Sequence, residues 1–247
     1  MPVPELGPLV LAGSGEYTPA MDVVDEYLLK AIGGRPVLLI ATSCAMEGED
    51  AMTKWEQMGV EHFKRLGIEA TPVRIKDQDD ANIQAHAELI ADAGLVWFSG
   101  GSPTYLAHAF NDTLAWHALE AANRRGTAVA GASGGLGVLN DHVPSTQPDA
   151  PAGPTALGLA APVRALAHFD RMEARRPEFV ERVLSSLQPG QMAIGVDEDT
   201  TVIWYEGVWR VMGHKRAVLF DGEERVVYHH GEVVDGLPVP TRSLSAP

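Results

Sequence analysis

The sequence predicts an α/β fold, a three-layer sandwich with a mostly parallel central sheet and a short antiparallel C-terminal portion. Short apolar runs alternate with amphipathic helical stretches through the first half of the chain, and most of the runs end in glycine loops. This alternation is the pattern of a parallel sheet with helices on both faces. The second half instead contains short strand-like segments with little helical sequence between them. We expect the 247 residues to form one domain, 1–247, that is loosely ordered from about residue 237.

The predicted elements follow from the spacing of apolar residues. Strands of the parallel sheet are expected over residues 9–12, 36–41, 69–75, 94–99 and 127–130, and helices between them over 21–32, 55–66, 81–93 and 104–124. A helix over 177–187 and strands over 192–196, 200–205, 208–212, 217–220 and 225–229 follow a long loop over 140–159. Ligands bind such sheets at the carboxyl ends of the strands. The loops at 13–15, 42–44, 100–102 and 131–135 should therefore converge on one crevice.

Composition and charge limit the partners. The net charge of −14 argues against a nucleic acid, because binding a phosphate backbone needs a basic face. No apolar run approaches the roughly 18 residues that a membrane span needs, so no membrane partner is expected. The N-terminus has no basic segment followed by an apolar stretch, and the single cysteine, Cys44, cannot form an intrachain disulfide. We therefore expect a soluble protein with a cytoplasmic location.

The pentapeptide Gly131-Ala132-Ser133-Gly134-Gly135 fits the pattern G-x-S-x-G. In a nucleophile elbow of this kind, a serine sits on a sharp turn between a strand and a helix, and glycines let the backbone crowd together. The turn projects Ser133 Oγ into the crevice and aims the N–H of Gly134 at a developing oxyanion. The alternative is that the small residues merely permit a tight turn, but the preceding apolar strand favours a nucleophile.

The neighbouring strand end, Phe98-Ser99-Gly100-Gly101-Ser102-Pro103, offers a second donor. The N–H of Gly101 could join that of Gly134 in a two-donor oxyanion hole. Ser102 also fits the N-cap of a following helix, with Pro103 in its first turn. Both interpretations can hold together.

A serine nucleophile needs a base, because its hydroxyl attacks poorly at neutral pH. Four of the nine histidines lie in predicted helices, where a solvated or structurally satisfied imidazole is the usual state. His168 falls at a predicted strand end after the long loop, and His142 lies on the loop just after the elbow. Spacing favours His168 only modestly. No pair of histidines has a metal-ligand spacing such as H-E-x-x-H, so neither a metal nor another cofactor is expected.

Five motifs occur in a suggestive order: Gly13-Ser14-Gly15, Phe98-Ser99-Gly100-Gly101, Gly131-Ala132-Ser133, His168-Phe169 and Gly195-Val196-Asp197-Glu198-Asp199-Thr200. This order resembles the cyanophycinase and aspartyl dipeptidase (dipeptidase E-like) family of serine peptidases over most of the chain. The resemblance implies a class I glutamine amidotransferase-like, flavodoxin-type fold with serine in place of the cysteine nucleophile.

The resemblance also implies roles for individual residues. Ser133 would be the nucleophile and His168 its base, with the oxyanion held by the backbone of Gly101 and Gly134. The acidic residue of the triad would follow the serine at a short distance, which points to Asp149, with Asp141 as the next choice. Asp197 and Glu198 match a recurring acidic pair of cyanophycinases, which we interpret as structural or substrate-side.

Departures from the family concern the substrate more than the chemistry. Ser102 and Pro103 stand where cyanophycinases commonly carry an acidic residue and a glutamine, and Gly134-Gly135-Leu136 replaces the usual Ala-Gly-Ala. Ser102 and Arg171 are the candidate substrate-binding residues, since an arginine can pair bidentately with a carboxylate.

The sequence thus favours a serine peptidase or amidohydrolase that cleaves a small peptide or isopeptide, with an acidic residue beside the scissile bond as one option. A homodimer is a further expectation that the sequence leaves open. Two alternatives remain: a small-molecule-binding protein of the same fold that has lost the chemistry, and an esterase that uses the same elbow.

Overall fold

The computed structural model describes residues 6–144, 153–222 and 224–240. Its larger sheet has seven strands in the order β3-β2-β4-β5-β1-β8-β9. The strands are β1 (Leu9–Ala12), β2 (Val37–Ile40), β3 (Ala70–Pro72), β4 (Leu95–Phe98), β5 (Ala128–Ala132), β8 (Thr200–Tyr205) and β9 (Val208–Gly213). The first five in this order are parallel, and β8 and β9 are antiparallel to their neighbours. The sheet is therefore mostly parallel, as the sequence predicts.

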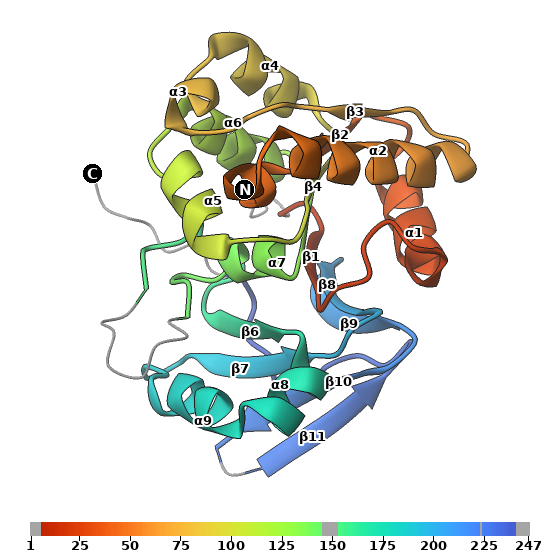
Figure 1. Cartoon of the computed structure of the whole chain (residues 1–247). Coiled ribbons are helices and arrows are strands. Elements are labelled where there is room, and N and C mark those ends of the chain that lie inside the picture. Colours follow the sequence, from red (N-terminus) through yellow and green to blue (C-terminus); the bar gives the residue numbers. More distant parts are fainter. Residues whose placement is uncertain (1–5, 145–152, 223, 241–247) are drawn as a thin grey trace, which may run out of the picture.

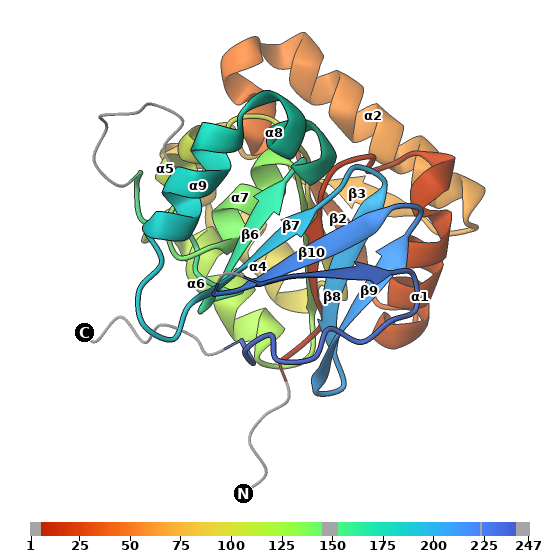
Figure 2. The ribbon, with the colours of Figure 1, turned by 90° about the horizontal axis from the view of Figure 1, so that it is seen from below.

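A second sheet of four strands has the order β11-β10-β7-β6. Its strands are β6 (Val163–Ala167), β7 (Met192–Val196), β10 (Arg216–Asp221) and β11 (Glu224–His229). Strands β6 and β7 run parallel, whereas β10 is antiparallel to both of its neighbours. In Figure 1 this sheet lies below the larger one, and in Figure 2, which is seen from below, it lies in front of it. The short antiparallel C-terminal portion expected from the sequence is thus divided between two sheets.

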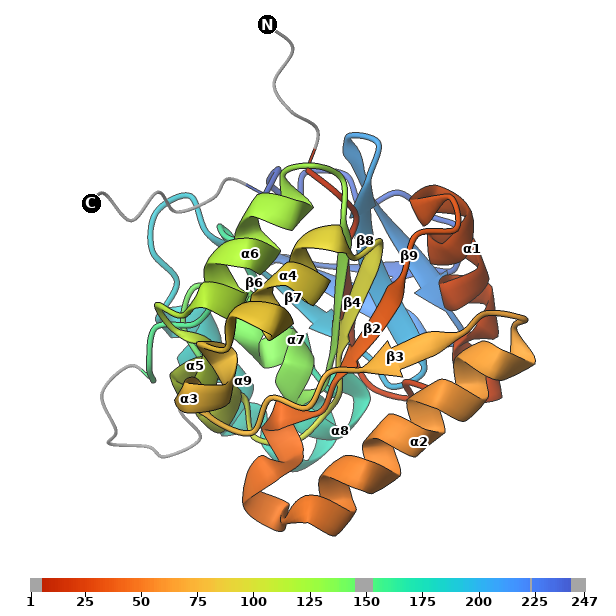
Figure 3. The same cartoon turned by 90° about the horizontal axis from the view of Figure 1, so that it is seen from above.

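Helices cover both faces of the larger sheet, which confirms the three-layer prediction. One face carries α1 (Asp22–Ile32) and α2 (Glu49–Arg65). The other carries α3 (Gln78–Ala81), α4 (Gln84–Asp92), α5 (Pro103–Phe110), α6 (Leu114–Asn123) and α7 (Gly134–Leu139). Figure 3 shows the two groups on opposite sides of the strands. The described residues also form two short 3₁₀ helices, η1 (Pro19–Met21) and η2 (Thr42–Glu47). Helices α8 (Phe169–Arg175) and α9 (Pro177–Ser185) pack on the second sheet.

Alternation along the strands decides which layer each side chain joins. In β1, Leu9 and Leu11 pack into the cluster on the α5–α7 side, whereas Val10 faces α1. Successive residues of a strand point to opposite faces, so a strand buried on both sides is apolar throughout. The second sheet follows the same rule: Ile194 joins the core of the larger sheet, and its neighbour Ala193 packs under α8 and α9. One apolar cluster therefore holds the two sheets together.

The long helix predicted over 104–124 is wrong, because the chain breaks into α5 and α6. The C-cap of α5, Asn111, has a non-helical ψ of 126°, and Asp112 after it has φ of +59°, so neither residue continues the helix. Thr113 then caps α6, its Oγ1 accepting a hydrogen bond from the N–H of Trp116 at 3.3 Å. Short polar side chains bond to nearby backbone and favour caps over helix interiors. The helix predicted over 81–93 corresponds to α4, which begins at Gln84 after the extended residue Ile83, and the short α3 precedes it.

The two irregular segments are packed where they are described. His142 and Thr155 form an isolated antiparallel bridge across the long loop. Leu237, at the start of the segment expected to be loosely ordered, is buried, and the carbonyl of Pro238 accepts a hydrogen bond from Trp209 Nε1 at 2.7 Å. None of the helices in the described part of the chain is long and apolar enough to cross a membrane.

Candidate active site

The carboxyl ends of strands from both sheets meet at one crevice. Ser133 follows β5 of the larger sheet, and His168 follows β6 of the second. Strand β7 pairs with β6 so that Val196 lies opposite Ala167, which places Glu198 just beyond the end of β7 and beside His168. The site is therefore assembled across the junction of the two sheets.

Ser133 occupies the sharp turn that the sequence predicts. Its φ of +50° and ψ of −109° are strained for a residue with a side chain. The strain is held by hydrogen bonds on both sides, from the N–H of Ser133 to Ala12 O and from the N–H of Gly137 to Ser133 O. A Cβ at Gly131 would overlap the backbone of Gly135. The glycines are thus needed because strand and helix backbones touch across the turn.

The serine faces an imidazole. His168 Nε2 lies 2.6 Å from Ser133 Oγ, and His168 Nδ1 lies 3.0 Å from Glu198 Oε1. An ionised carboxylate can only accept a hydrogen bond, so Nδ1 carries the proton and Nε2 accepts the serine hydroxyl. The backbone of His168 also lies in the left-handed region, with φ of +121°. Strained backbone at both residues is common at functional sites.

Glu198, interpreted from the sequence as structural or substrate-side, is the carboxylate that contacts His168. Asp149 lies outside the described residues. Asp141 is engaged elsewhere, since its carboxylate accepts hydrogen bonds of 2.6 Å from both Arg164 and Gln191. Burial raises the pKa of Asp141, but Arg164 and Gln191 outweigh it and hold that pKa below its usual value. His142, the competing base, lies 3.5 Å from Asp141.

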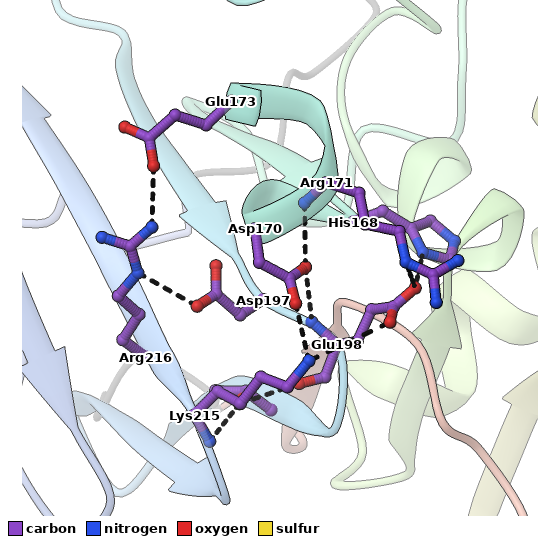
Figure 4. A network of polar contacts seen from close by, with 9 residues as sticks. His168, Asp170, Arg171, Glu173, Asp197, Glu198, Lys215 and Arg216 are labelled. Atoms are coloured by element: carbon purple, nitrogen blue, oxygen red, sulfur yellow. Dashed lines mark hydrogen bonds and ion pairs between the residues drawn. The ribbon is translucent and has the colours of Figure 1, made fainter. Parts of the chain in front are cut away.

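Basic groups surround the Glu198 carboxylate (Figure 4). Arg171 Nε lies 3.0 Å from Glu198 Oε1, and Lys215 Nζ lies 4.0 Å from Oε2. Lys215 also bonds to Asp170 at 2.6 Å, and Asp170 accepts the N–H of Glu198 at 3.3 Å. These contacts hold the Glu198 carboxylate in one direction.

The neighbouring carboxylate, Asp197, belongs to a different set of contacts. Its Oδ2 lies 3.0 Å from Arg216 Nε, and Arg216 in turn bonds to Glu173 at 2.7 Å (Figure 4). Burial raises the pKa of Asp197. The two members of the acidic pair thus differ in their contacts: Asp197, just after β7, is paired with Arg216 of β10, and Glu198 contacts the imidazole of His168.

The Gly100–Gly101 loop lies against the serine. Gly101 has φ of +137°, and a Cβ there would come within 2.5 Å of Ser43 O. The carbonyl of Gly100 accepts hydrogen bonds from Ser43 Oγ at 2.6 Å and Cys44 Sγ at 2.9 Å. A Cβ at Gly134 would overlap the Gly101 carbonyl, so the two glycine turns are in direct backbone contact. Gly134 is the first residue of α7, where the N–H has no partner within the helix.

Two further ionisable groups are buried near this loop. Glu16 Oε1 accepts the N–H of Gly100 at 2.8 Å, and burial raises the pKa of Glu16. Burial also raises the pKa of the Cys44 thiol to about 11. Because the thiolate is the nucleophilic form of cysteine, the raised pKa lowers the reactivity of Cys44.

Both candidate substrate-binding side chains, Ser102 and Arg171, are engaged in contacts within the protein. Ser102 Oγ accepts a hydrogen bond from the N–H of Tyr105 at 3.2 Å and so caps α5. Arg171 is paired with Glu198. Among the residues described, no group of three or more His, Cys, Asp or Glu side chains could hold a metal ion.

Comparison with known proteins identifies the relatives of this site. The model of peptidase family S51 matches residues 9–211. The chain belongs to peptidase family S51. Two cyanophycinases, from Trichormus variabilis and from a Nostoc species, are each 24% identical to this S51 peptidase over 96% of its length and 80% of theirs. The resemblance drawn from the sequence motifs is therefore confirmed.

Solved structures agree with this assignment. A crystal structure of a peptidase from an acI-B1 actinobacterium is 30% identical, with a TM-score of 0.86, and covers 94% of this S51 peptidase and 98% of its own chain. A putative peptidase E protein from Listeria monocytogenes is 14% identical, with a TM-score of 0.56 over 91% and 98% of the two chains, and so shows the same fold. The protein is therefore a peptidase of family S51, and these comparisons favour an enzyme over a binding protein that has lost the chemistry.

Proposed function

We propose that this peptidase hydrolyses a small peptide or isopeptide with a triad of Ser133, His168 and Glu198. The observation that carries the proposal is the unbroken contact chain from Ser133 Oγ to His168 and from His168 to Glu198, at 2.6 Å and 3.0 Å. Asp149, the acid implied by the family resemblance, stays a prediction that the described residues do not reach.

The chemistry follows from this geometry. His168 Nε2 takes the proton of Ser133 as Oγ attacks the scissile carbonyl, and Glu198 stabilises the imidazolium that forms. His168 then gives the proton to the leaving amine. A water molecule, deprotonated by the same nitrogen, hydrolyses the acyl-enzyme and releases the acid product.

The oxyanion hole would consist of the N–H groups of Gly101 and Gly134. Both belong to glycine turns that touch each other beside Ser133. Loss of one such donor costs about 10²–10³ in rate in serine peptidases. The tight packing of the two turns supports a preorganised hole, because donors already in place need not reorganise during the reaction.

Covalent labelling tests the proposal without knowledge of the substrate. We expect a serine-directed fluorophosphonate to add one adduct mass to the wild type, and to fail with Ser133→Ala and His168→Ala. His142→Ala is the matched control and should label like the wild type, because His142 contacts Asp141. An unlabelled wild type, under conditions that label a known serine peptidase, would overturn the proposed nucleophile. Hydrolysis of matched amide and ester substrates separates a peptidase from an esterase.

A further inference from the structure

A small cavity opens directly beside the proposed nucleophile. Its volume is about 200 Å³, and Ser133, His168 and the two oxyanion-hole glycines form part of its wall. Ligand pockets for drug-sized molecules have volumes of about 300–1,000 Å³. The cavity therefore has room for one side chain of a substrate.

The rest of the wall is apolar. The side chains come from the start of α5 and from α7, β6, α8 and α9. The larger ones are Pro103, Leu136, Leu166, Met172 and Phe179. Within the described segments, His168 is the only ionisable side chain that lines the cavity. A methionine and an aromatic ring give a wall that adapts to an apolar group and offers no charge to a polar one.

The nearby cations do not reach this wall. Arg171 is paired with Glu198, and Arg164 with Asp141. A substrate carboxylate in the cavity would lose its hydration without gaining a cationic partner, which is costly. It would also lie near two acidic side chains, Glu198 and Glu16, which border the same crevice.

The cavity opens beside the groups that would hold the scissile carbonyl. Gly101 and Gly134, which would hold the carbonyl oxygen, line it together with Pro103 and Leu136, each two residues further along the chain. The side chain of the residue that supplies the scissile carbonyl is attached one atom from that carbonyl, so it is the group within reach of the cavity.

We propose that this cavity is a specificity pocket for an apolar side chain on the residue that supplies the scissile carbonyl. This inference rests on the proposed function. The substrate class is then small peptides with a leucine-, methionine- or phenylalanine-like residue at that position rather than an acidic one. In a hydrophobic pocket, a difference of one methylene group between two substrates changes kcat/KM by about 10–200-fold.

Two phosphonate probes of matched size and leaving group test the pocket. One carries an isobutyl side chain and the other a carboxymethyl side chain, and the rate of Ser133 modification is followed by intact mass. We expect the isobutyl probe to react about 10–100-fold faster. Equal rates, or a faster carboxymethyl probe, would overturn the inference.

A plain fluorophosphonate separates failure of the pocket from failure of the proposed function. If it labels Ser133 while neither side-chain probe reacts, the pocket assignment is wrong and the nucleophile stands. If it does not label Ser133 either, the proposed function itself fails.

Variants with a matched control give a second readout. Met172→Arg places a cation in the wall and should slow the isobutyl probe at least about 10-fold while speeding the carboxymethyl probe. Met46→Arg adds the same charge at a residue that is 73% exposed and outside the cavity, and should change neither rate. An unchanged preference in a folded Met172→Arg variant would contradict the proposal.

Discussion

Ser43 Oγ donates a 2.6 Å hydrogen bond to the carbonyl oxygen of Gly100. That carbonyl shares a peptide plane with the N–H of Gly101, and in a trans peptide the two groups point in opposite directions. Holding the carbonyl on one side therefore aims the N–H to the other. Cys44 Sγ bonds to the same oxygen, and Glu16 holds the N–H of Gly100. A glycine pair, which would otherwise rotate freely, is thus held in one orientation.

Ser43→Ala should lower kcat with little change in KM, because it loosens a donor that acts on the transition state. We expect a fall of about 10–10²-fold, less than complete loss of one oxyanion donor, since Cys44 still holds the carbonyl. Steady-state kinetics check this. Ser99→Ala is the control: Ser99 Oγ faces Tyr17 Oη instead, so kcat should stay near wild type. Equal effects of the two variants would argue against a positioning role for Ser43.

Glu198→Gln should lower kcat by about 10²–10⁴-fold while leaving the fold intact. Glutamine matches the size of glutamate but cannot balance the imidazolium, and it can favour the wrong tautomer of His168. The measurement is kcat together with circular dichroism. The comparison is Asp149→Asn: if that variant loses activity and Glu198→Gln keeps it, Asp149 is the acid of the triad and our assignment of Glu198 is wrong.

Asp141→Asn should cost stability rather than activity. Its carboxylate accepts bonds from Arg164 and Gln191, and charged hydrogen bonds contribute about 1–3 kcal/mol. Because the folded pKa lies below the usual 3.8, this stability is present above that pH and is lost as the pH falls through the folded value. Denaturant titrations should thus show a lower free energy of unfolding for the variant at neutral pH. If the variant unfolds at the same denaturant concentration as the wild type at neutral pH, the expectation is wrong.

Glu16→Gln should raise the melting temperature at about pH 8. Burial raises the folded pKa of Glu16 above its usual 4.5, so its stabilising contribution is present below that pH and is lost as the pH rises through the folded value. The titratable groups that face it are His168, Tyr17 and Cys44, of which His168 opposes the shift. Thermal melts at about pH 8 and pH 4 check the sign. A variant that melts below wild type at about pH 8 would contradict it.

Strongly patterned parts of the chain were predictable. Apolar runs such as Leu9–Ala12 and Leu95–Phe98 are buried on both faces, a pattern that is typical of a parallel strand between helix layers. The turn at Ser133 was visible because its glycines are required by backbone contact. Helix breaks were not visible, since Asp112 and Thr113 interrupt an apolar spacing that otherwise continues through them.

The carboxylate beside His168 depends on a pairing that the sequence does not display. Both predicted strand ends, at Ala167 and Val196, were recognised, but nothing in the sequence says that β6 and β7 are neighbours. Had their pairing been known, the register would have placed Glu198 beside His168. The contacts of Ser43 and Glu16 are unpredictable for a related reason. Both side chains bond to the backbone of Gly100, and no sequence motif marks such a contact.

The division of the proposed triad between two sheets bears on how the protein is made. Ser133 is carried by the larger sheet, and His168 and Glu198 by the second. During synthesis the nucleophile leaves the ribosome well before its two partners, and it gains them only when the second sheet has docked. A nascent or truncated chain that lacks the second sheet therefore lacks the proposed base and acid, so we expect its serine to stay unreactive until the complete fold has formed.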